Sequence, residues 1–162
     1  MVVRYGDLLE ANVDIIAHQV NCKGVMGAGL ARQIREKYPE VYEQYKDLCN
    51  RPEYRGGNSE LLLGRCQIIE VDQASKPKFV LNLFAQNDYG RQGVYINYIA
   101  FASCMVQIND FCKSFNHRLT VGMPYGIGCG LAGGDLLKTL FIINQTITDA
   151  DVELYKLSRT QS

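Results

Sequence analysis

The sequence contains no tryptophan, two histidines and four prolines, and it has no excess of either charge. Seventeen Lys and Arg residues balance seventeen Asp and Glu residues, so the formal net charge is zero. We therefore expect no stable nucleic-acid partner held by bulk electrostatics. No apolar run approaches the ~18 residues that a membrane-spanning helix needs. The first residues, MVVRYGDLLEANVDII, lack the pattern of a secretory signal, so we expect no membrane association and a cytoplasmic location.

Metal-binding and disulfide patterns are also missing. The six cysteines are widely spaced, with no Cys-x-x-Cys pair and no Cys/His cluster at zinc-ligand spacing. We expect reduced cysteines packed as small apolar side chains, and neither a metal ion nor a cofactor. The 162 residues, 47% of them hydrophobic, are enough for one sizeable core. We therefore predict a single domain over residues 1–162.

Short apolar runs alternate along the chain with segments of helical periodicity. Strand-like runs occupy residues 2–5, 13–20, 61–71 (interrupted by a glycine), 79–84, 119–123 and 152–157. Helical spacing is found at residues 30–38, 41–50, 95–115 and 135–148. This alternation predicts an α/β fold of three layers, with a mixed, mostly parallel sheet between helices. Such sheets bind ligands beyond the carboxyl ends of their strands.

One glycine-rich segment, NCKGVMGAGL at residues 21–30, leads from a strand into a helix. In this first glycine loop, three glycines allow main-chain amides to approach a ligand without an intervening side chain. The N-terminus of the following helix adds a partial positive charge. Both features suit a phosphate or diphosphate. The spacing is neither the dinucleotide fingerprint nor a P-loop, and a close-packed turn would also fit it.

A second glycine-rich segment, PYGIGCGLAGGD at residues 124–135, also follows a strand and precedes a helix. So many glycines in a plain connection would be entropically unfavourable, which argues for a ligand-binding role of this second glycine loop. Because both loops follow strands of one sheet, we predict that they lie together. We expect them to clamp a diphosphate from both sides with main-chain amides.

The order and spacing of five segments resemble those of the macro domain, an α/β/α module that binds ADP-ribose. These segments cover nearly the whole chain and lie at residues 6–9, 13–22, 24–31, 123–131 and 152–157. Two enzyme groups of the superfamily are most similar: the ADP-ribose 1″-phosphate phosphatases and the terminal ADP-ribose protein glycohydrolases. The similarity to both groups lies in His18, NCKG at 21–24 and KYPE at 37–40. GRC at 64–66 and NY at 97–98 favour the phosphatase group.

The resemblance implies a set of ligand-binding residues. Asp7 would accept a hydrogen bond from the adenine amino group, beside the amide of Leu8, although an aspartate there is also typical of a turn. Leu157 or Tyr155 would contact the adenine, unless either is simply a core residue. Asn21 would bind the distal ribose. The diphosphate would lie against Gly27, Ala28, Gly29, Gly128, Cys129, Gly130 and Leu131.

The catalytic lysine of the glycohydrolases has no counterpart in the matching stretch. That stretch offers Gln86 or Ala85 instead, and glutamine cannot form a Schiff base with an opened ribose. We therefore do not expect a lysine-dependent mechanism, and we assign Gln86 to ligand binding. Cys129 is a weak candidate nucleophile, because nothing in the sequence places a base beside it.

Three residues are the candidates for catalysis: His18, Asn21 and Asp135. A histidine can act as acid or base near neutral pH. Together with the loop amides, these side chains could position a water for phosphomonoester hydrolysis without a metal. The structural alternatives are a satisfied core histidine at position 18 and a helix N-cap at Asp135.

Three functions fit the resemblance. The leading prediction is a hydrolase of ADP-ribose 1″-phosphate or a related ADP-ribosyl ester. The absence of the lysine suggests instead a noncatalytic reader of free or protein-linked ADP-ribose. A glycohydrolase that releases ADP-ribose from protein or nucleic acid is the third. The expected partner in each case is ADP-ribose or ADP-ribose 1″-phosphate, free or as part of an ADP-ribosylated macromolecule.

Overall fold

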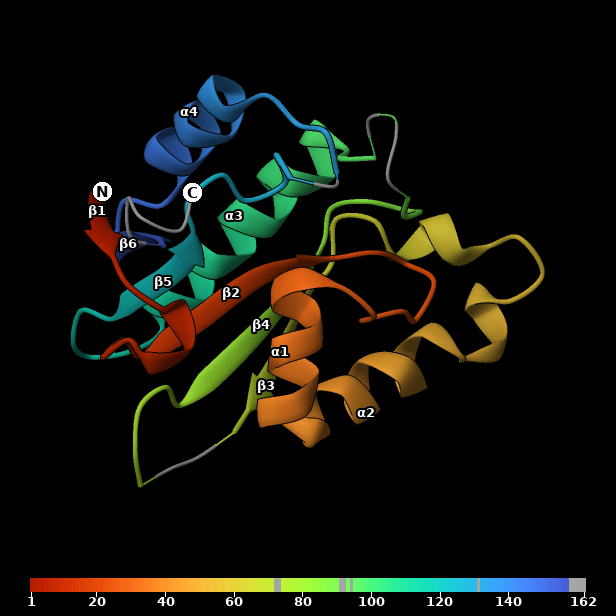
Figure 1. Ribbon diagram of the computed structural model, residues 1–162, viewed down its shortest axis with the longest axis horizontal. Coiled ribbons are helices and arrows are strands. Elements are labelled where there is room, and N and C mark those ends of the chain that lie inside the picture. Colours follow the sequence, from red (N-terminus) through yellow and green to blue (C-terminus); the bar gives the residue numbers. More distant parts are fainter. Residues whose placement is uncertain (72–73, 91–92, 94, 131, 158–162) are drawn as a thin grey trace.

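A six-stranded sheet forms the centre of the molecule in the computed structural model, which describes residues 1–71, 74–90, 93, 95–130 and 132–157 (Figure 1). The strands are β1 Val2–Tyr5, β2 Ile15–Val20, β3 Cys66–Glu70, β4 Phe79–Phe84, β5 Thr120–Pro124 and β6 Asp151–Lys156. Their order across the sheet is β1-β6-β5-β2-β4-β3. All neighbouring pairs are parallel except β3 and β4. The predicted mixed, mostly parallel sheet is confirmed.

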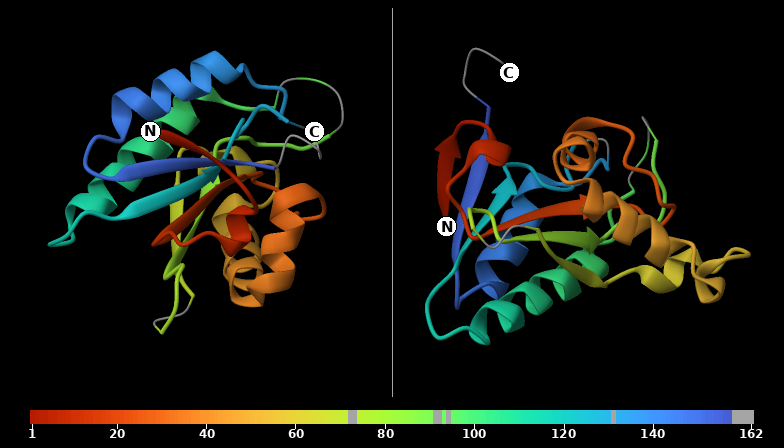
Figure 2. Two further views of the ribbon diagram at one scale, coloured as in Figure 1. Left: turned by 60° about the vertical axis from the view of Figure 1, so that its left-hand side comes forward. Right: turned by 90° about the horizontal axis from the view of Figure 1, so that it is seen from below.

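Helices cover both faces of the sheet, as predicted for three layers (Figures 1 and 2). They are α1 Gly29–Lys37, α2 Pro39–Cys49, α3 Tyr98–Lys113 and α4 Leu136–Thr146. Helices α1 and α2 lie on one face, and α3 and α4 lie on the other. Two apolar cores result, because alternate residues of β2 point to opposite faces: Ile16 and Val20 pack toward α1 and α2, and Ile15 and Ala17 toward α3.

The two largest differences between predicted and observed element boundaries have local causes. The predicted strand at 61–71 is shortened to β3, because residues Ser59–Leu62 form a 3₁₀ turn and Gly64 adopts a φ of +90°. Helix α3 begins at Tyr98 rather than at residue 95, because the Asn97 side chain accepts a hydrogen bond from the Ala100 amide and caps the helix. The preceding residues instead pair with the second glycine loop, where the amide of Tyr95 donates to the carbonyl oxygen of Ala132.

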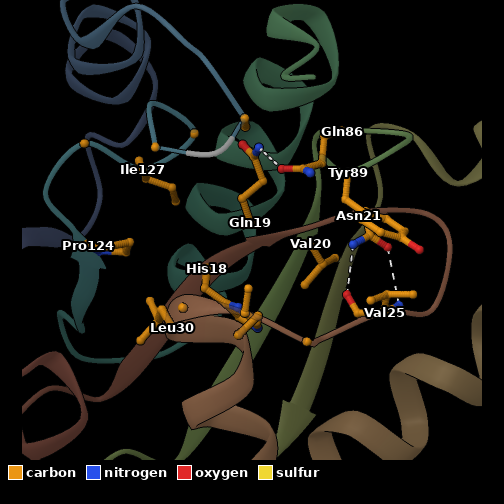
Figure 3. A pocket seen from close by; sticks show the side chains of 18 of the residues that line it. His18, Gln19, Val20, Asn21, Val25, Leu30, Gln86, Tyr89, Pro124 and Ile127 are labelled. Carbon is orange, nitrogen blue, oxygen red and sulfur yellow. Dashed lines mark hydrogen bonds between the residues drawn. The ribbon is translucent and has the colours of Figure 1, made fainter. Parts of the chain in front are cut away.

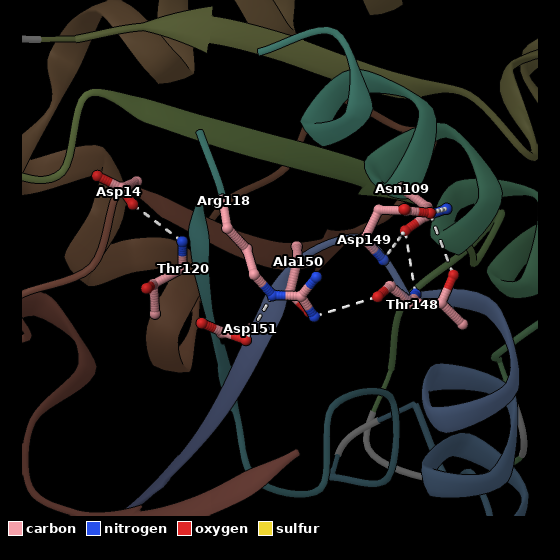
Figure 4. A network of polar contacts seen from close by, with 8 residues as sticks. All are labelled: Asp14, Asn109, Arg118, Thr120, Thr148, Asp149, Ala150 and Asp151. Atoms are coloured by element: carbon pink, nitrogen blue, oxygen red, sulfur yellow. Dashed lines mark hydrogen bonds and ion pairs between the residues drawn. The ribbon is translucent and has the colours of Figure 1, made fainter. Parts of the chain in front are cut away.

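Polar contacts close the amino end of the sheet, away from both glycine loops (Figure 4). Arg118 Nε lies 2.8 Å from Asp151 Oδ1. Asn109 Oδ1 accepts hydrogen bonds from the amides of Thr148 and Asp149. Such exposed contacts contribute little stability individually, but they fix the loops at this end. The opposite, carboxyl end is where the sheet leaves room for a ligand.

Candidate functional site

A cavity of about 600 Å³ opens at the carboxyl ends of β2, β4 and β5 (Figure 3). Both glycine loops and the turn after β4 border it, so the structure brings the two loops together as predicted. Ligand cavities commonly occupy this position in α/β sheets. The described lining residues include His18, Gln19, Val20, Asn21, Val25, Gly27, Ala28, Gly29, Leu30, Ala31, Gln86, Tyr89, Gly90, Pro124, Gly126, Ile127, Gly128, Gly130 and Ala132.

Two buried side chains hold the first glycine loop in shape. Asn21 Oδ1 accepts a hydrogen bond from the amide of Lys23, and Asn21 Nδ2 donates to the carbonyl oxygen of Val25. The hydroxyl of Tyr45 lies 2.7 Å from the Asn21 carbonyl oxygen and 2.8 Å from Asn21 Oδ1. Burial raises the pKa of Tyr45, so this hydroxyl stays protonated. The Asn21 side chain therefore lies in the cavity wall with its polar atoms already bonded to its own loop.

The N-terminus of α1 faces the cavity without a side-chain cap. Ala28 occupies the N-cap position, where no side-chain hydrogen bond is made. Among the described residues, no hydrogen bond is donated by the amides of Gly27, Gly29 or Leu30. Uncapped amides at a helix N-terminus are donors for an anion. This side of the cavity can therefore accept a phosphate group.

The second glycine loop holds its shape through its own main chain. Cys129 N donates to Gly126 O at 2.8 Å, and Gly134 N donates to Gly128 O at 2.9 Å. Gly128 has a φ of +77°, and a Cβ built on it would lie 2.5 Å from Ile96 Cδ1. Within the described part of the chain, the amides of Gly128 and Gly130 donate no hydrogen bond. A second set of free donors therefore borders the same cavity.

Two glutamines connect the central strands to the turn that follows β4. Gln19 Nε2 donates to Gln86 Oε1 at 2.6 Å, and Gln86 Nε2 donates to the carbonyl oxygen of Asp88 at 2.8 Å. Because a carbonyl oxygen can only accept, the Asp88 contact fixes the orientation of both side-chain amides. Sequence reasoning selected Gln86 but missed Gln19. The only available signal was a second polar residue next to His18 in an otherwise apolar strand.

His18 is among the residues that line the cavity, but the residue is only 1% exposed. Its Nε2 lies 2.6 Å from Asn82 Oδ1, and Asn82 Nδ2 donates to Gln67 Oε1. Because Asn82 donates through Nδ2, its Oδ1 must accept, and the proton of the His18 ring therefore lies on Nε2. The other ring nitrogen, Nδ1, is buried without a partner among the described residues. Burial lowers the pKa of His18 to about 4. The ring is therefore neutral at pH 7, and this arrangement resembles the core histidine more than the predicted acid or base.

The other catalytic candidate, Asp135, does not join His18 and Asn21 at the cavity. Its carboxylate accepts hydrogen bonds from the amides of Leu137 and Lys138, so it is the N-cap of α4. Asp135 is exposed and is not among the described lining residues. The structure thus supports the helix N-cap alternative for this residue.

The remaining predicted ligand residues fall into two groups. Seven line the cavity: Asn21, Gly27, Ala28, Gly29, Gln86, Gly128 and Gly130. Four are not among the described lining residues: Asp7, Leu8, Cys129 and Leu157. Leu131 lies outside the described residues.

Local packing accounts for the residues that do not reach the cavity. Asp7 accepts a hydrogen bond from the amide of Leu9 and caps a short 3₁₀ helix, Leu8–Glu10. Leu8 is buried beneath Gly122 in β5. Leu157 follows β6 and is 56% exposed. Cys129 Sγ lies 3.5 Å from Thr139 Oγ1 in α4. These contacts account for the absence of the four side chains from the described lining of the cavity.

The described residues contain no group of three His, Cys, Asp or Glu side chains arranged to hold a metal ion. All six cysteines are free. Burial raises the pKa of Cys22 and of Cys104 to about 12, so these thiols are protonated and poorly nucleophilic. In the described part of the chain, every helix is too short or too polar to cross a membrane.

Comparison with known proteins gives similarity over most of the chain, although no family model matches it. An ADP-ribose 1″-phosphate phosphatase of Scheffersomyces stipitis is 36% identical over 147 residues, which cover 76% of this chain and 83% of that protein. A DNA ADP-ribosyl glycohydrolase of Mycobacterium bovis is 28% identical over 151 residues, or 93% of this chain. The chain spans about 40% of the length of this mycobacterial relative.

The comparison with solved structures agrees with the comparison of sequences. The macrodomain of Mycobacterium tuberculosis DarG is similar with a TM-score of 0.76 and 25% identity, over 97% of this chain and 99% of that one. One conclusion follows from the sheet order, from the two glycine loops at the carboxyl ends of the strands and from the identity to the phosphatase of Scheffersomyces stipitis. The chain belongs to the macro domain family.

Proposed function

We propose that the chain is an ADP-ribose-binding hydrolase, which holds an ADP-ribose unit in the cavity and cleaves a bond at its distal ribose. One observation carries the proposal: free main-chain amides from the start of α1 and from the second glycine loop border the same cavity. A diphosphate between them would receive hydrogen bonds from both sides. The volume of about 600 Å³ is in the range of pockets that hold ligands of nucleotide size.

The sheet order suggests how the ligand would lie. Strands β6 and β1 lie beyond β5, and Asp7 and Leu157 follow the carboxyl ends of β1 and β6 on that side of the sheet. Asn21 and Gln86, at the ends of β2 and β4, border the other end. We assign the adenine to the end near Asp7, Leu8 and Leu157, and the distal ribose to the end near Asn21 and Gln86. The diphosphate then lies between the two glycine loops.

The hydrolase activity is proposed from the names of the two relatives. One relative is named for removing a phosphate from ADP-ribose, and the other for removing an ADP-ribosyl group from DNA. The first reaction would break the phosphate ester at the 1″ position of the distal ribose, and the second would break the glycosidic bond at the same position, so both would act at one place on the ligand. Hydrolysis at this position would use water and the bound substrate, with the loop amides stabilising negative charge.

A noncatalytic reader is the second candidate, and one observation favours it. None of the described lining residues is Asp, Glu, Lys or Arg, and the His18 nitrogens are buried. Any catalysis would therefore rest on orientation of the substrate and on main-chain donors rather than on a charged side chain.

Two measurements test the proposal. Calorimetry with purified protein should show binding of ADP-ribose that is much tighter than binding of AMP, because AMP lacks the diphosphate. Incubation with ADP-ribose 1″-phosphate should release phosphate above the rate in buffer. Binding without release of any group from an ADP-ribosyl substrate would favour the reader, and absence of ADP-ribose binding would refute both candidates.

A further inference from the structure

Two consecutive residues of β2 that line the cavity each carry a buried hydrogen-bond acceptor without a donor. They are His18, through Nδ1, and Gln19, through Oε1; neither atom has a partner in the part of the chain that the structure describes. Nearly all buried polar atoms in folded proteins are hydrogen-bonded, because an unpaired one is destabilising. Two such acceptors at one cavity favour a ligand that brings donor groups to this part of the wall.

A row of side-chain amides crosses the sheet and ends at His18. It starts at a main-chain carbonyl group, because Gln67 Nε2 donates to the carbonyl oxygen of Gln44 at 3.1 Å. Gln67 Oε1 then accepts from Asn82 Nδ2 at 3.0 Å, and Asn82 Oδ1 lies 2.6 Å from His18 Nε2. A carbonyl oxygen can only accept, so this first contact fixes the direction of every hydrogen bond in the row. The ring proton is therefore held on Nε2, and Nδ1 keeps its lone pair.

A second row of amides, which shares no residue with the first, ends at Gln19 (Figure 3). Gln86 Nε2 donates to the carbonyl oxygen of Asp88, and Gln86 Oε1 accepts from Gln19 Nε2. The amide of Gln19 is therefore oriented so that its oxygen, rather than a donor, is left without a partner. A Cβ built on Gly128 would lie 2.9 Å from this oxygen, which places it beside the second glycine loop. Both rows thus leave acceptors at the cavity, whereas the glycine loops leave main-chain donors.

Donors and acceptors in the cavity wall select different parts of a ligand. Ionised phosphate oxygens only accept hydrogen bonds, so they match the loop amides and are repelled by the lone pair of His18. A hydroxyl group carries the donor that Nδ1 needs, and the donors of ADP-ribose outside the adenine are its ribose hydroxyls, so the inference rests on the proposed function. We propose that Asn82 and Gln67 are positioning residues: they hold His18 in the tautomer whose Nδ1 accepts a hydrogen bond from a ribose hydroxyl of the bound ligand and keeps phosphate oxygens away.

His18 acts in this arrangement as a neutral acceptor and takes no part in proton transfer. Burial lowers the pKa of His18 to about 4, so the ring is uncharged at pH 7. A protonated ring would donate from both nitrogens and would attract phosphate instead of a hydroxyl. This role differs from the acid or base that the sequence predicted, because it requires a fixed, uncharged ring.

Ring ¹⁵N NMR of His18 reads the tautomer directly, and the second histidine of the chain, His117, is an internal control. His117 is exposed and contacts Asn116, outside both rows of amides. Two substitutions at the partly buried Gln67 form a matched pair. Gln67→Glu keeps an oxygen acceptor for Asn82, whereas Gln67→Lys offers only donors, so Asn82 should turn over and present Nδ2 to the ring. The probes are ADP-ribose and inorganic pyrophosphate, which both carry a diphosphate, although only ADP-ribose carries ribose hydroxyls.

Wild type and Gln67→Glu should carry the His18 proton on Nε2, and ADP-ribose should shift the Nδ1 resonance whereas pyrophosphate should not. Gln67→Lys should move the proton to Nδ1 and raise the Kd of ADP-ribose about fivefold, the factor expected for one lost hydrogen bond, while the His117 resonances stay in place.

A wild-type ring with its proton on Nδ1, or one tautomer shared by Gln67→Glu and Gln67→Lys, would overturn the role of the two amides. An Nδ1 resonance that bound ADP-ribose leaves in place, or that pyrophosphate shifts equally, would overturn the hydroxyl contact. Failure to bind ADP-ribose would instead overturn the proposed function, and the spectra of the free protein would still decide the tautomer.

Discussion

The two glycine loops border the same cavity, but they are held in shape by different means. Side chains hold the first loop: Asn21 and the hydroxyl of Tyr45 occupy its inner hydrogen-bonding groups. The second loop is held by bonds within its own main chain and by glycines in the left-handed region, such as Gly128. The first loop should therefore be sensitive to the loss of a buried polar group, and the second to the addition of a side chain.

Acidification should give the largest effect on the free energy of unfolding. It acts through His18, on the side of β2 that faces the first loop. Burial lowers the pKa of His18 from 6.5 to about 4. Below pH 6.5 the unfolded chain therefore binds a proton that the folded chain does not. The free energy of unfolding should fall between pH 6.5 and pH 4, by about 3 kcal/mol from this group. Urea unfolding of wild type and of His18→Leu across this range measures it, and equal slopes in both proteins would contradict the assignment.

Asn21→Ala should disrupt the first loop more than any other single polar substitution. It leaves the amide of Lys23 and the carbonyl oxygen of Val25 without their side-chain partner. We expect a loss of about 2–3 kcal/mol in the free energy of unfolding, together with weaker ADP-ribose binding. Asn58→Ala is the control, because Asn58 is exposed and its side chain caps nothing. Similar losses in both variants would show that the Asn21 contacts do not shape the loop.

Gly128→Ala is the corresponding change in the second loop. The new Cβ would meet Ile96 Cδ1 at 2.5 Å, and the φ of +77° is unfavourable for alanine. We expect a stability loss of about 2 kcal/mol, and displacement of the loop amides should weaken ADP-ribose binding at least tenfold. In Gly130→Ala the Cβ meets no atom within 4 Å, so its thermal unfolding should match wild type. A Gly128→Ala protein with wild-type Tm and affinity would refute the role given to this loop geometry.

Tyr45→Phe should have the smallest effect, because only one hydroxyl is removed from the first loop. The main-chain amide of Val25 keeps Asn21 Oδ1 as an acceptor at 3.4 Å. We expect a loss of about 1 kcal/mol in chemical denaturation. Tyr54→Phe serves as the comparison, since the Tyr54 hydroxyl makes an exposed contact with Arg65. A larger loss for Tyr54→Phe would reverse the expected order.

The sequence predicted the layers and the meeting of the two loops because both follow from repeating patterns. Apolar runs such as β4 Phe79–Phe84 alternate with helical segments, and strands in a parallel sheet end at the same edge. Boundaries were harder to predict, because they depend on single contacts between distant residues. The start of α3, for example, depends on the Asn97 cap and on pairing of Tyr95 with Ala132.

The side-chain chemistry of the site was predicted less well than its main-chain geometry. The hydrogen bonding of the buried His18 ring depends on Asn82 and Gln67, which lie on two other strands and carry no local signal of that pairing. The same applies to Gln19, whose partner Gln86 is far away in the sequence. Asp135 illustrates the opposite case, because the N-cap that a helix needs is a local feature.

The central claim is that main-chain amides of both loops bind one diphosphate, and an NMR titration of ¹⁵N-labelled protein with ADP-ribose tests it most directly. The amide resonances of Gly27, Gly29, Gly128 and Gly130 should shift together at one saturating concentration, while those of Gly56 and Gly57, which are not among the described lining residues, should stay in place. Shifts confined to one loop, or none in either, would contradict the account.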